Sequence, residues 1–154
     1  MPHNRETQNT PVIAANDAAI RSTLAVGLLG IALVHVIDGI GKYTEVPYMF
    51  WMYVGLIISS LALAGGLLFT RSKWVLPATV GLVASALIGF ILSRTTGLPN
   101  ATDDIGNWGE TIGVVNLFVE ITTLMVAVPA MALAGRVRSD VRVRRGAESA
   151  PLSA

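Results

Sequence analysis

Four long apolar stretches constrain the fold of this chain more than any other feature. They cover residues 22–41, 46–70, 74–93 and 111–135. Each is close to the length of about 20 residues that a helix needs to cross a hydrocarbon core about 30 Å thick. Charged residues make up 14% of the sequence, whereas soluble domains carry about a quarter. The sequence therefore predicts an all-α integral membrane protein, a bundle of four transmembrane helices.

The short connections between these stretches leave room for one membrane domain. We expect residues 1–21 to form a polar cytoplasmic segment, 22–135 the four-helix transmembrane domain, and 136–154 a basic, disordered cytoplasmic tail. The polar start lacks the short apolar core and the cleavage site of a secretory signal, so the first span is expected to be retained. The chain has no cysteine, which excludes disulfides and thiolate chemistry.

The basic residues predict the orientation, because connections rich in Lys and Arg stay in the cytoplasm. Most of them precede the first span, separate the second from the third, or follow the fourth: Arg5, Arg21, Arg71, Lys73, Arg136, Arg138, Arg142, Arg144 and Arg145. We therefore expect a multi-pass protein of the cytoplasmic (inner) membrane with both termini in the cytoplasm. The basic tail suits anionic lipid headgroups, and we expect no nucleic-acid binding because it lacks interleaved aromatic residues.

Aromatic residues gather at the predicted outer ends of the spans, where such rings usually lie at the level of the headgroups. We interpret them as interfacial anchors: Tyr43, Tyr48, Trp51, Tyr53 and Trp108.

Polar residues recur on one face of the first span and its exit. His35, Asp38, Lys42 and Glu45 are three, four and three residues apart, so they share one side of a helix. Asp38 followed by Lys42 is the order that favours an ion pair within a helix.

The fourth span carries a second polar face that includes Asn116 and Glu120. A rise of 1.5 Å per residue places His35 and Glu120 at about the same depth, about 12 to 13 Å inside the membrane. Ionisable groups at such depth usually face the interior of a bundle and mark a binding site. We therefore predict an outward-facing polar pocket between the first and fourth helices. His35 and Glu120 are expected to touch directly or through one water or ligand, with Asp38 and Asn116 one turn further out.

An alternative stays open, in which His35, Asn116 and Glu120 form a buried hydrogen-bonded clasp between two helices and have no further role.

The long connection from Arg94 to Glu110 is expected to cap this pocket. Arg94 should pair with Asp103 or Asp104, since guanidinium and carboxylate groups match in a bidentate fork. Asn107, with Glu110 three residues later, resembles a capping box that opens the fourth helix.

Small residues four apart predict close packing between the helices. They occur in three pairs: Gly55 and Ser59, Ser85 and Gly89, Gly109 and Gly113.

No motif in the chain fixes a reaction. The nucleophile elbow, the zinc-protease motif and the phosphate-binding loop are all missing from the sequence. His35, Asp38 and Glu120 offer one nitrogen and two carboxylates, short of the usual ligand sets for zinc or iron. Met49 and Met52 would be soft ligands for Cu(I), although packing is the commoner role of methionine. We assign no metal site, and the sequence indicates no particular cofactor.

The segment Asp38-Gly39-Ile40-Gly41-Lys42, followed by an aromatic stretch and a second span, resembles the corresponding element of DoxX-like proteins. These are small bacterial four-helix membrane proteins, some of which are associated with quinone-linked oxidation. Asp38 stands where the family commonly has a His before Gly, and His35 lies one turn earlier. The long connection, with Arg94-Thr95-Thr96-Gly97-Leu98-Pro99 and Gly106-Asn107-Trp108, also resembles loops of four-span membrane proteins from actinobacteria. This second resemblance implies no activity.

The sequence favours a non-enzymatic role as a binding or accessory component of a membrane complex. Its partners would be the lipid bilayer and either other membrane proteins or further copies of the chain. The DoxX-like resemblance implies the main alternative, a quinone- or metal-linked membrane oxidoreductase subunit with its site near His35. A proton-coupled carrier of small solutes is the third class, although one His and one Glu make a short pathway.

Overall fold

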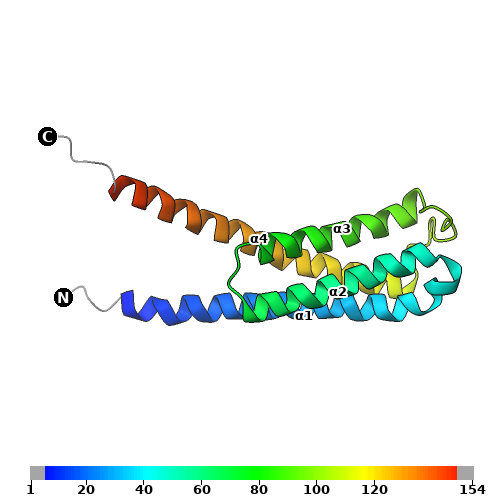
Figure 1. Cartoon of the computed structure of the whole chain (residues 1–154), viewed down its shortest axis with the longest axis horizontal. Coiled ribbons are helices and arrows are strands. Elements are labelled where there is room, and N and C mark those ends of the chain that lie inside the picture. The colour runs from blue at the N-terminus through cyan, green and yellow to red at the C-terminus, as the bar shows by residue number, and fades with distance from the viewer. Residues whose placement is uncertain (1–5, 149–154) are drawn as a thin grey trace.

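The computed structural model describes residues 6–148, and nearly all of them are helical. The four helices are α1 (Glu6–Glu45), α2 (Pro47–Phe69), α3 (Val75–Thr95) and α4 (Thr111–Glu148) (Figure 1). Each contains a segment long and apolar enough to cross a membrane: Ala15–Glu45, Pro47–Phe69, Val75–Thr95 and Thr111–Val137. Within residues 6–148 the β structure consists of one isolated bridge between Leu98 and Ala101. The predicted all-α class is thus confirmed for the described part of the chain.

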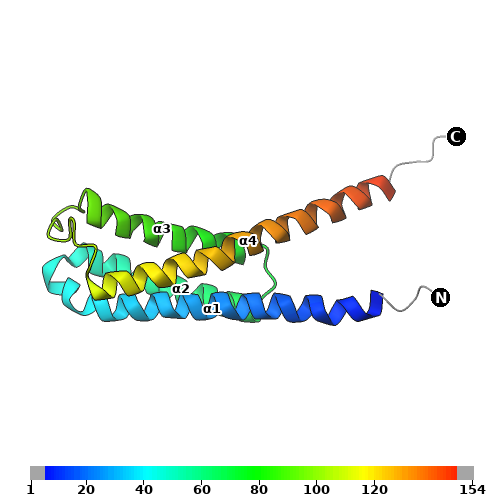
Figure 2. The same cartoon turned by 180° about the vertical axis from the view of Figure 1, so that it is seen from behind.

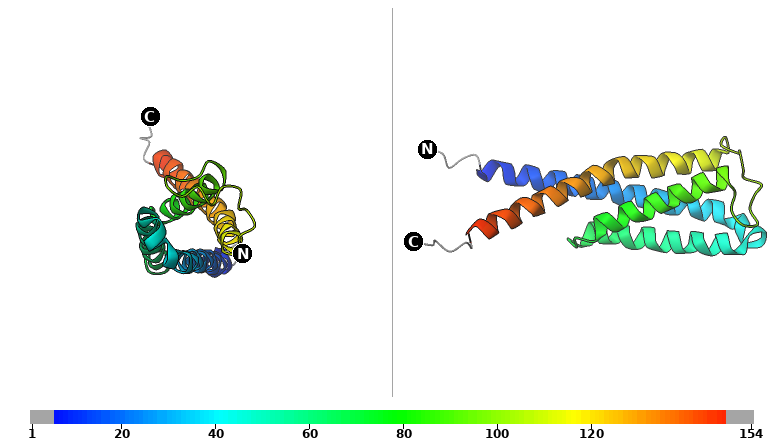
Figure 3. Two further views of the ribbon diagram at one scale, coloured as in Figure 1. Left: turned by 90° about the vertical axis from the view of Figure 1, so that its right-hand side faces the viewer. Right: turned by 90° about the horizontal axis from the view of Figure 1, so that it is seen from above.

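The helices form a four-sided bundle in which sequence neighbours are also spatial neighbours. α1 packs against α2 and α4, and α3 packs against α2 and α4, while the two diagonal pairs make no close backbone contacts. The end-on view in Figure 3 shows this arrangement.

The two ends of the bundle differ. We call the end with the α1–α2 connection and the loop 96–110 the loop end. The opposite end, with the α2–α3 connection, the start of α1 and the end of α4, is the terminal end (Figures 1 and 2).

The helix ends follow local sequence signals at two connections. Pro47 occupies the first turn of α2, where its missing N–H costs no hydrogen bond. The loop between α3 and α4 turns at Gly97 and Gly106, whose φ angles of 75° and 78° suit residues without a side chain. Asn100 is the third loop residue with a positive φ, 56°, and asparagine tolerates this region better than most residues.

The basic segment after the fourth span differs from its prediction. α4 continues to Glu148, so residues 136–148 are helical where the sequence analysis expected disorder. Arginine is a good helix former, and a charged composition alone does not end a helix. Likewise α1 begins at Glu6, within the polar segment 1–21. Residues 1–5 and 149–154, with Arg5 among them, lie outside the described residues.

The apolar core lies in the terminal half of the bundle and receives side chains from all four helices. Its buried members are Leu24, Ala25, Leu28, Ile31, Ala64, Leu67, Val83 and Ala127. α1 and α4 approach most closely beside this core. A Cβ on Gly27 would overlap the side chain of Thr123, and one on Gly30 would lie 3.1 Å from Val119. Glycine therefore allows this close approach.

Most glycines of the predicted small-residue pairs do not lie at close helix contacts. Gly55, Gly89 and Gly109 have open space where a Cβ would be, so these positions are not close helix contacts. Gly113 is the exception, because a Cβ there would meet Phe90 and Arg94 of α3. Of the glycines in the three predicted pairs, only Gly113 lies at a close helix contact, since spacing does not say which side of a helix faces a neighbour.

Candidate ligand-binding pocket

A cavity of about 330 Å³ lies in the loop half of the bundle. Residues from all four helices line it, as expected for a bundle in which the described backbones of diagonal helices do not approach closely. The prediction placed the pocket between the first and fourth helices; both line the cavity, and α2 and α3 line it as well. Its polar lining includes His35, Asp38, Lys42, Tyr53, Arg94 and Asn116. Its apolar lining includes Met49, Met52, Leu56 and Phe90.

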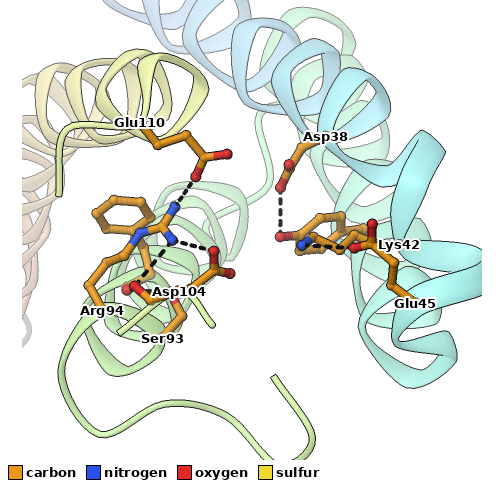
Figure 4. A network of polar contacts seen from close by, with 9 residues as sticks. Asp38, Lys42, Glu45, Ser93, Arg94, Asp104 and Glu110 are labelled. Atoms are coloured by element: carbon orange, nitrogen blue, oxygen red, sulfur yellow. Dashed lines mark hydrogen bonds and ion pairs between the residues drawn. The ribbon is translucent and has the colours of Figure 1, made fainter. Parts of the chain in front are cut away.

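Arg94 anchors one wall of the pocket. Its guanidinium donates from Nη1 to Asp104 Oδ1 at 2.7 Å and from Nη2 to Glu110 Oε2 at 2.5 Å (Figure 4). The side chain is only 6% exposed, and its Cζ lies 5.1 Å from the centre of the Phe90 ring. The predicted pairing of Arg94 with Asp104 is confirmed. Glu110, which the sequence suggested as part of a capping box, instead directs its carboxylate to Arg94.

The loop 96–110 is tied to the helices by further contacts. The backbone N–H of Gly106 donates to the carbonyl oxygen of Arg94 at 2.9 Å, and Tyr48 OH donates to the carbonyl oxygen of Pro99 at 2.6 Å. Ala101 packs against Val46 and Met49. The loop thus covers the end of the cavity and contributes to its lining.

Asp38 faces the ion-pair cluster of Arg94, Asp104 and Glu110 from the other side of the bundle (Figure 4). Its Oδ2 accepts a hydrogen bond from Tyr53 OH at 2.8 Å. Lys42 pairs with Glu45 instead, with 3.5 Å between Nζ and Oε2, so the predicted ion pair between Asp38 and Lys42 is wrong. Tyr53 reaches Asp38 from α2, which a pattern within one helix does not reveal. Among the described residues, Asp38 has no cationic side chain within ion-pair distance.

Glu45 lies outside the pocket although the sequence grouped it with these residues. Its side chain is 62% exposed.

His35 and Glu120 do not hydrogen bond to each other in the described structure. Nδ1 of His35 lies 2.9 Å from the carbonyl oxygen of Ile31. The imidazole ring packs edge-on against the ring of Tyr53, with 4.9 Å between the ring centres. Oε1 of the fully buried Glu120 accepts from Asn116 Nδ2 at 3.0 Å. The direct contact is not formed, while a contact through one water or ligand stays a prediction.

The predicted equal depth of His35 and Glu120 is wrong. α1 and α4 pack with Gly27 against Thr123 and Gly30 against Val119. Glu120 therefore lies more than one turn nearer the terminal end than His35. Asn116 lines the cavity and Glu120 does not.

Four buried polar atoms have no hydrogen-bond partner within the described residues: Ser60 Oγ, Arg94 Nε, Asn116 Oδ1 and Glu120 Oε2. An unsatisfied buried group costs about 1 to 3 kcal/mol, and such groups call for an explanation. Arg94 and Asn116 both line the cavity and are 6% and 7% exposed. A molecule inside the cavity would lie beside both residues.

The sequence analysis missed Tyr53 as a pocket residue and assigned it to the membrane interface. It also missed Phe90 and Ser93, which line the cavity from α3. One signal was present, because Tyr53 follows Met49 by four residues and so lies on the same face of α2. Phe90 and Ser93 stand in an apolar helix without any polar pattern to mark them.

No group of three or more His, Asp or Glu side chains comes close enough to hold a metal ion in the part of the chain that is described. Comparison of the chain with protein-family models, with curated proteins and with solved structures found no match.

Proposed function

We propose that this chain is a four-span protein of the cytoplasmic membrane that binds a small ligand in the pocket at its loop end. It acts as a binding or accessory component of a membrane complex rather than as an enzyme. The cavity of about 330 Å³ carries this proposal. Small-molecule sites usually measure about 300 to 1,000 Å³ and combine apolar walls with a few polar groups. This pocket has both.

The surface of the bundle supports its placement in a membrane. Every helix exposes large apolar side chains, a pattern that soluble monomers avoid over large areas. Examples are Val26, Leu33, Ile40, Ile58, Leu68, Ile88, Phe118 and Met125. In a bilayer these side chains would contact lipid.

The distribution of Lys and Arg supports an orientation with the terminal end in the cytoplasm. Labelling of introduced cysteines tests it in a chain that has none of its own. Ser72 and Thr102 lie in exposed connections at opposite ends of the bundle. In intact cells, a membrane-impermeant maleimide should label cysteine at position 102 and spare cysteine at position 72. The reverse pattern would turn the pocket towards the cytoplasm.

Two glycines of α3 allow a matched test of ligand binding. Gly89 lines the cavity and Gly81 does not, and both have open space at the Cβ position. Gly89→Leu should fill the pocket, while Gly81→Leu adds the same side chain at an exposed site. We expect mass spectrometry of solvent extracts to find about one molecule of a bound compound per protein molecule in wild type and in Gly81→Leu. Gly89→Leu should lose it. Identical extracts from all three proteins would contradict the proposal.

One observation keeps the alternative of a quinone-linked subunit open. His35 lines the pocket, and Nε2 of its ring has no hydrogen-bond partner among the described residues. The absorption spectrum and the metal content of the same preparations test this alternative. A quinone band that changes on reduction, or a stoichiometric metal, would favour the oxidoreductase that the DoxX-like resemblance implies. A colourless preparation that retains an organic compound would favour the binding role.

A further inference from the structure

We propose that the pocket binds an amphiphilic amine, a protonated nitrogen attached to an apolar body. This inference rests on the proposed function, because it names the ligand class of the same pocket.

The cations that line the pocket are already paired with carboxylates. Arg94 binds Asp104 at 2.7 Å and Glu110 at 2.5 Å, and Lys42 lies 3.5 Å from Glu45. An anionic ligand would have to compete with these intramolecular partners for either cation. The charges of the pocket therefore disfavour an anion.

Asp38 is the pocket carboxylate that remains without a cation among the described residues. It accepts one hydrogen bond, at 2.8 Å, from the neutral hydroxyl of Tyr53. A carboxylate can accept about four hydrogen bonds, so most acceptor sites of Asp38 are unfilled. An ammonium group would supply both the missing charge and several donors.

Other open groups around Asp38 are also acceptors. Nδ1 of His35 faces the carbonyl oxygen of Ile31 at 2.9 Å, and a carbonyl only accepts, so Nδ1 carries a proton. In the neutral ring Nε2 is then an acceptor. Asn116 Oδ1 is a second acceptor without a partner. Arg94 Nε is the one buried donor left open among the pocket residues described. Lys42 Nζ also keeps N–H donors beyond its contact with Glu45. The open sites of Asp38, His35 and Asn116 are nevertheless acceptors, so these three residues suit a ligand that donates, whereas the two carbonyl oxygens of a quinone accept.

The rest of the pocket suits an apolar body. Met49, Met52 and Leu56 of α2 line it together with Phe90 of α3. Methionine side chains adapt to irregular apolar shapes. The apolar part of an amine would lie against these side chains while its nitrogen reaches Asp38.

Three probes that share one body and differ in their head group test the ligand class. They are 5-phenylpentylamine, 5-phenylpentan-1-ol and 5-phenylpentanoate, titrated calorimetrically into the purified protein in detergent after washing has removed the compound found in its extracts, with Gly89→Leu protein as the blank. Asp38→Asn keeps an acceptor for Tyr53 and removes the charge. Asp103→Asn is the matched control, because Asp103 is exposed at the same end and does not line the pocket.

We expect the amine to bind wild type and Asp103→Asn equally, and Asp38→Asn at least tenfold more weakly, as for the loss of a charged hydrogen-bond partner. The alcohol should bind all three proteins with the same, weaker affinity. If the alcohol or the carboxylate binds as well as the amine, or if Asp38→Asn has no effect, the amine class is wrong while a ligand-binding pocket stands. If no probe binds, the amine class is again wrong. The pocket itself is rejected only if Gly89→Leu also leaves the extracted compounds unchanged.

The same ammonium chemistry is present in a free amine and in the headgroup of phosphatidylethanolamine. Titration of the amine probe in nanodiscs separates these two sources. If the lipid is the occupant, replacing phosphatidylglycerol by phosphatidylethanolamine should weaken the apparent affinity at least tenfold. Equal affinity in both nanodiscs would identify a free amine.

Discussion

The terminal half and the loop half of the bundle are built from the same four helices but have different interiors. In the terminal half, apolar side chains such as Leu24, Leu28 and Leu67 are almost completely buried, and Gly27 lets α1 approach α4. In the loop half, the helices surround a cavity with both apolar and charged or polar walls. A packed apolar core gains stability, whereas a cavity with unsatisfied polar atoms loses some. The loop half thus gives up stability for a space that a ligand can occupy.

Each half also carries an ion-pair cluster, and the two clusters differ in burial. At the terminal end, Asp17 pairs with Arg21 and Arg71, whose side chains are 15% and 74% exposed. At the loop end, the central Arg94 is 6% exposed. Exposed pairs are worth about 1 kcal/mol or less, while a buried charge that loses its partner is costly. Substitutions at the loop end should therefore have larger effects.

The largest effect is expected for Arg94→Gln. The substitution leaves Asp104 and Glu110 without their cation and removes the tie between α3 and the loop. Breaking a buried pair costs about 3 to 5 kcal/mol. Because both carboxylates are partly exposed, we expect a loss of about 2 to 3 kcal/mol in the free energy of unfolding in detergent, with faster proteolysis in residues 96–110. Arg71→Gln is the control, and equal losses for both would remove the distinction between the ends.

Gly27→Ala should have the next largest effect. Its Cβ would overlap the side chain of Thr123, so α1 and α4 must move apart in the terminal half. Overpacking of this kind costs about 1 to 3 kcal/mol, measured by denaturant unfolding in detergent. Adding Thr123→Ala should restore most of the loss. Gly55→Ala, which meets open space, should change stability by less than about 0.5 kcal/mol. A Gly27→Ala protein as stable as wild type would mean that the terminal half is less tightly packed than described.

Asn116→Leu should cost about 1 to 2 kcal/mol of unfolding free energy. It removes the one hydrogen bond that Glu120 accepts within the described residues and leaves a fully buried carboxyl without a donor. Replacing both residues by leucine should recover most of this loss, because no buried polar group is then left alone. Thr122→Leu, at an exposed position of the same helix, should have little effect. If the loss in the double variant equals the sum of the losses of Asn116→Leu and Glu120→Leu alone, the two side chains are not coupled.

The smallest effect is expected at the terminal cluster. Asp17→Asn removes the partner of Arg21 and Arg71, but these side chains are partly exposed. We expect a loss below about 1 kcal/mol, which should shrink further in 1 M salt because of screening. Thermal unfolding of both proteins at low and high salt measures this. A loss as large as that of Arg94→Gln would mean that the terminal cluster is as buried as the loop-end cluster.

The predictions from the sequence were most successful where one helix or one connection contains the whole signal. The apolar stretches 46–70 and 74–93 correspond closely to α2 (Pro47–Phe69) and α3 (Val75–Thr95). The pairing of Arg94 with Asp103 or Asp104 was also predicted, and Asp104 is the partner: it follows Arg94 by ten residues in the loop that leaves the end of α3.

The prediction failed where contacts depend on how each helix is rotated about its own axis. A count of rise from assumed helix boundaries also does not give the register between two helices. Gly27 packs against Thr123 and Gly30 against Val119, so Glu120 lies at the level of Gly30 and not of His35. The contact of Asp38 with Tyr53 and the approach of Gly27 to Thr123 both depend on how two helices face each other. Sequence spacing alone contains no such information.

Electron density inside the pocket tests the central claim most directly, that the loop half of the bundle is built around a bound molecule. A crystal structure of the protein purified from its membrane, at a resolution that shows side chains, would provide it. We predict continuous density that does not belong to the protein, within hydrogen-bond distance of Asp38 and Asn116. A cavity closed by Met52 and Phe90, with the polar atoms of Asn116 and Arg94 bonded to protein groups, would contradict the account.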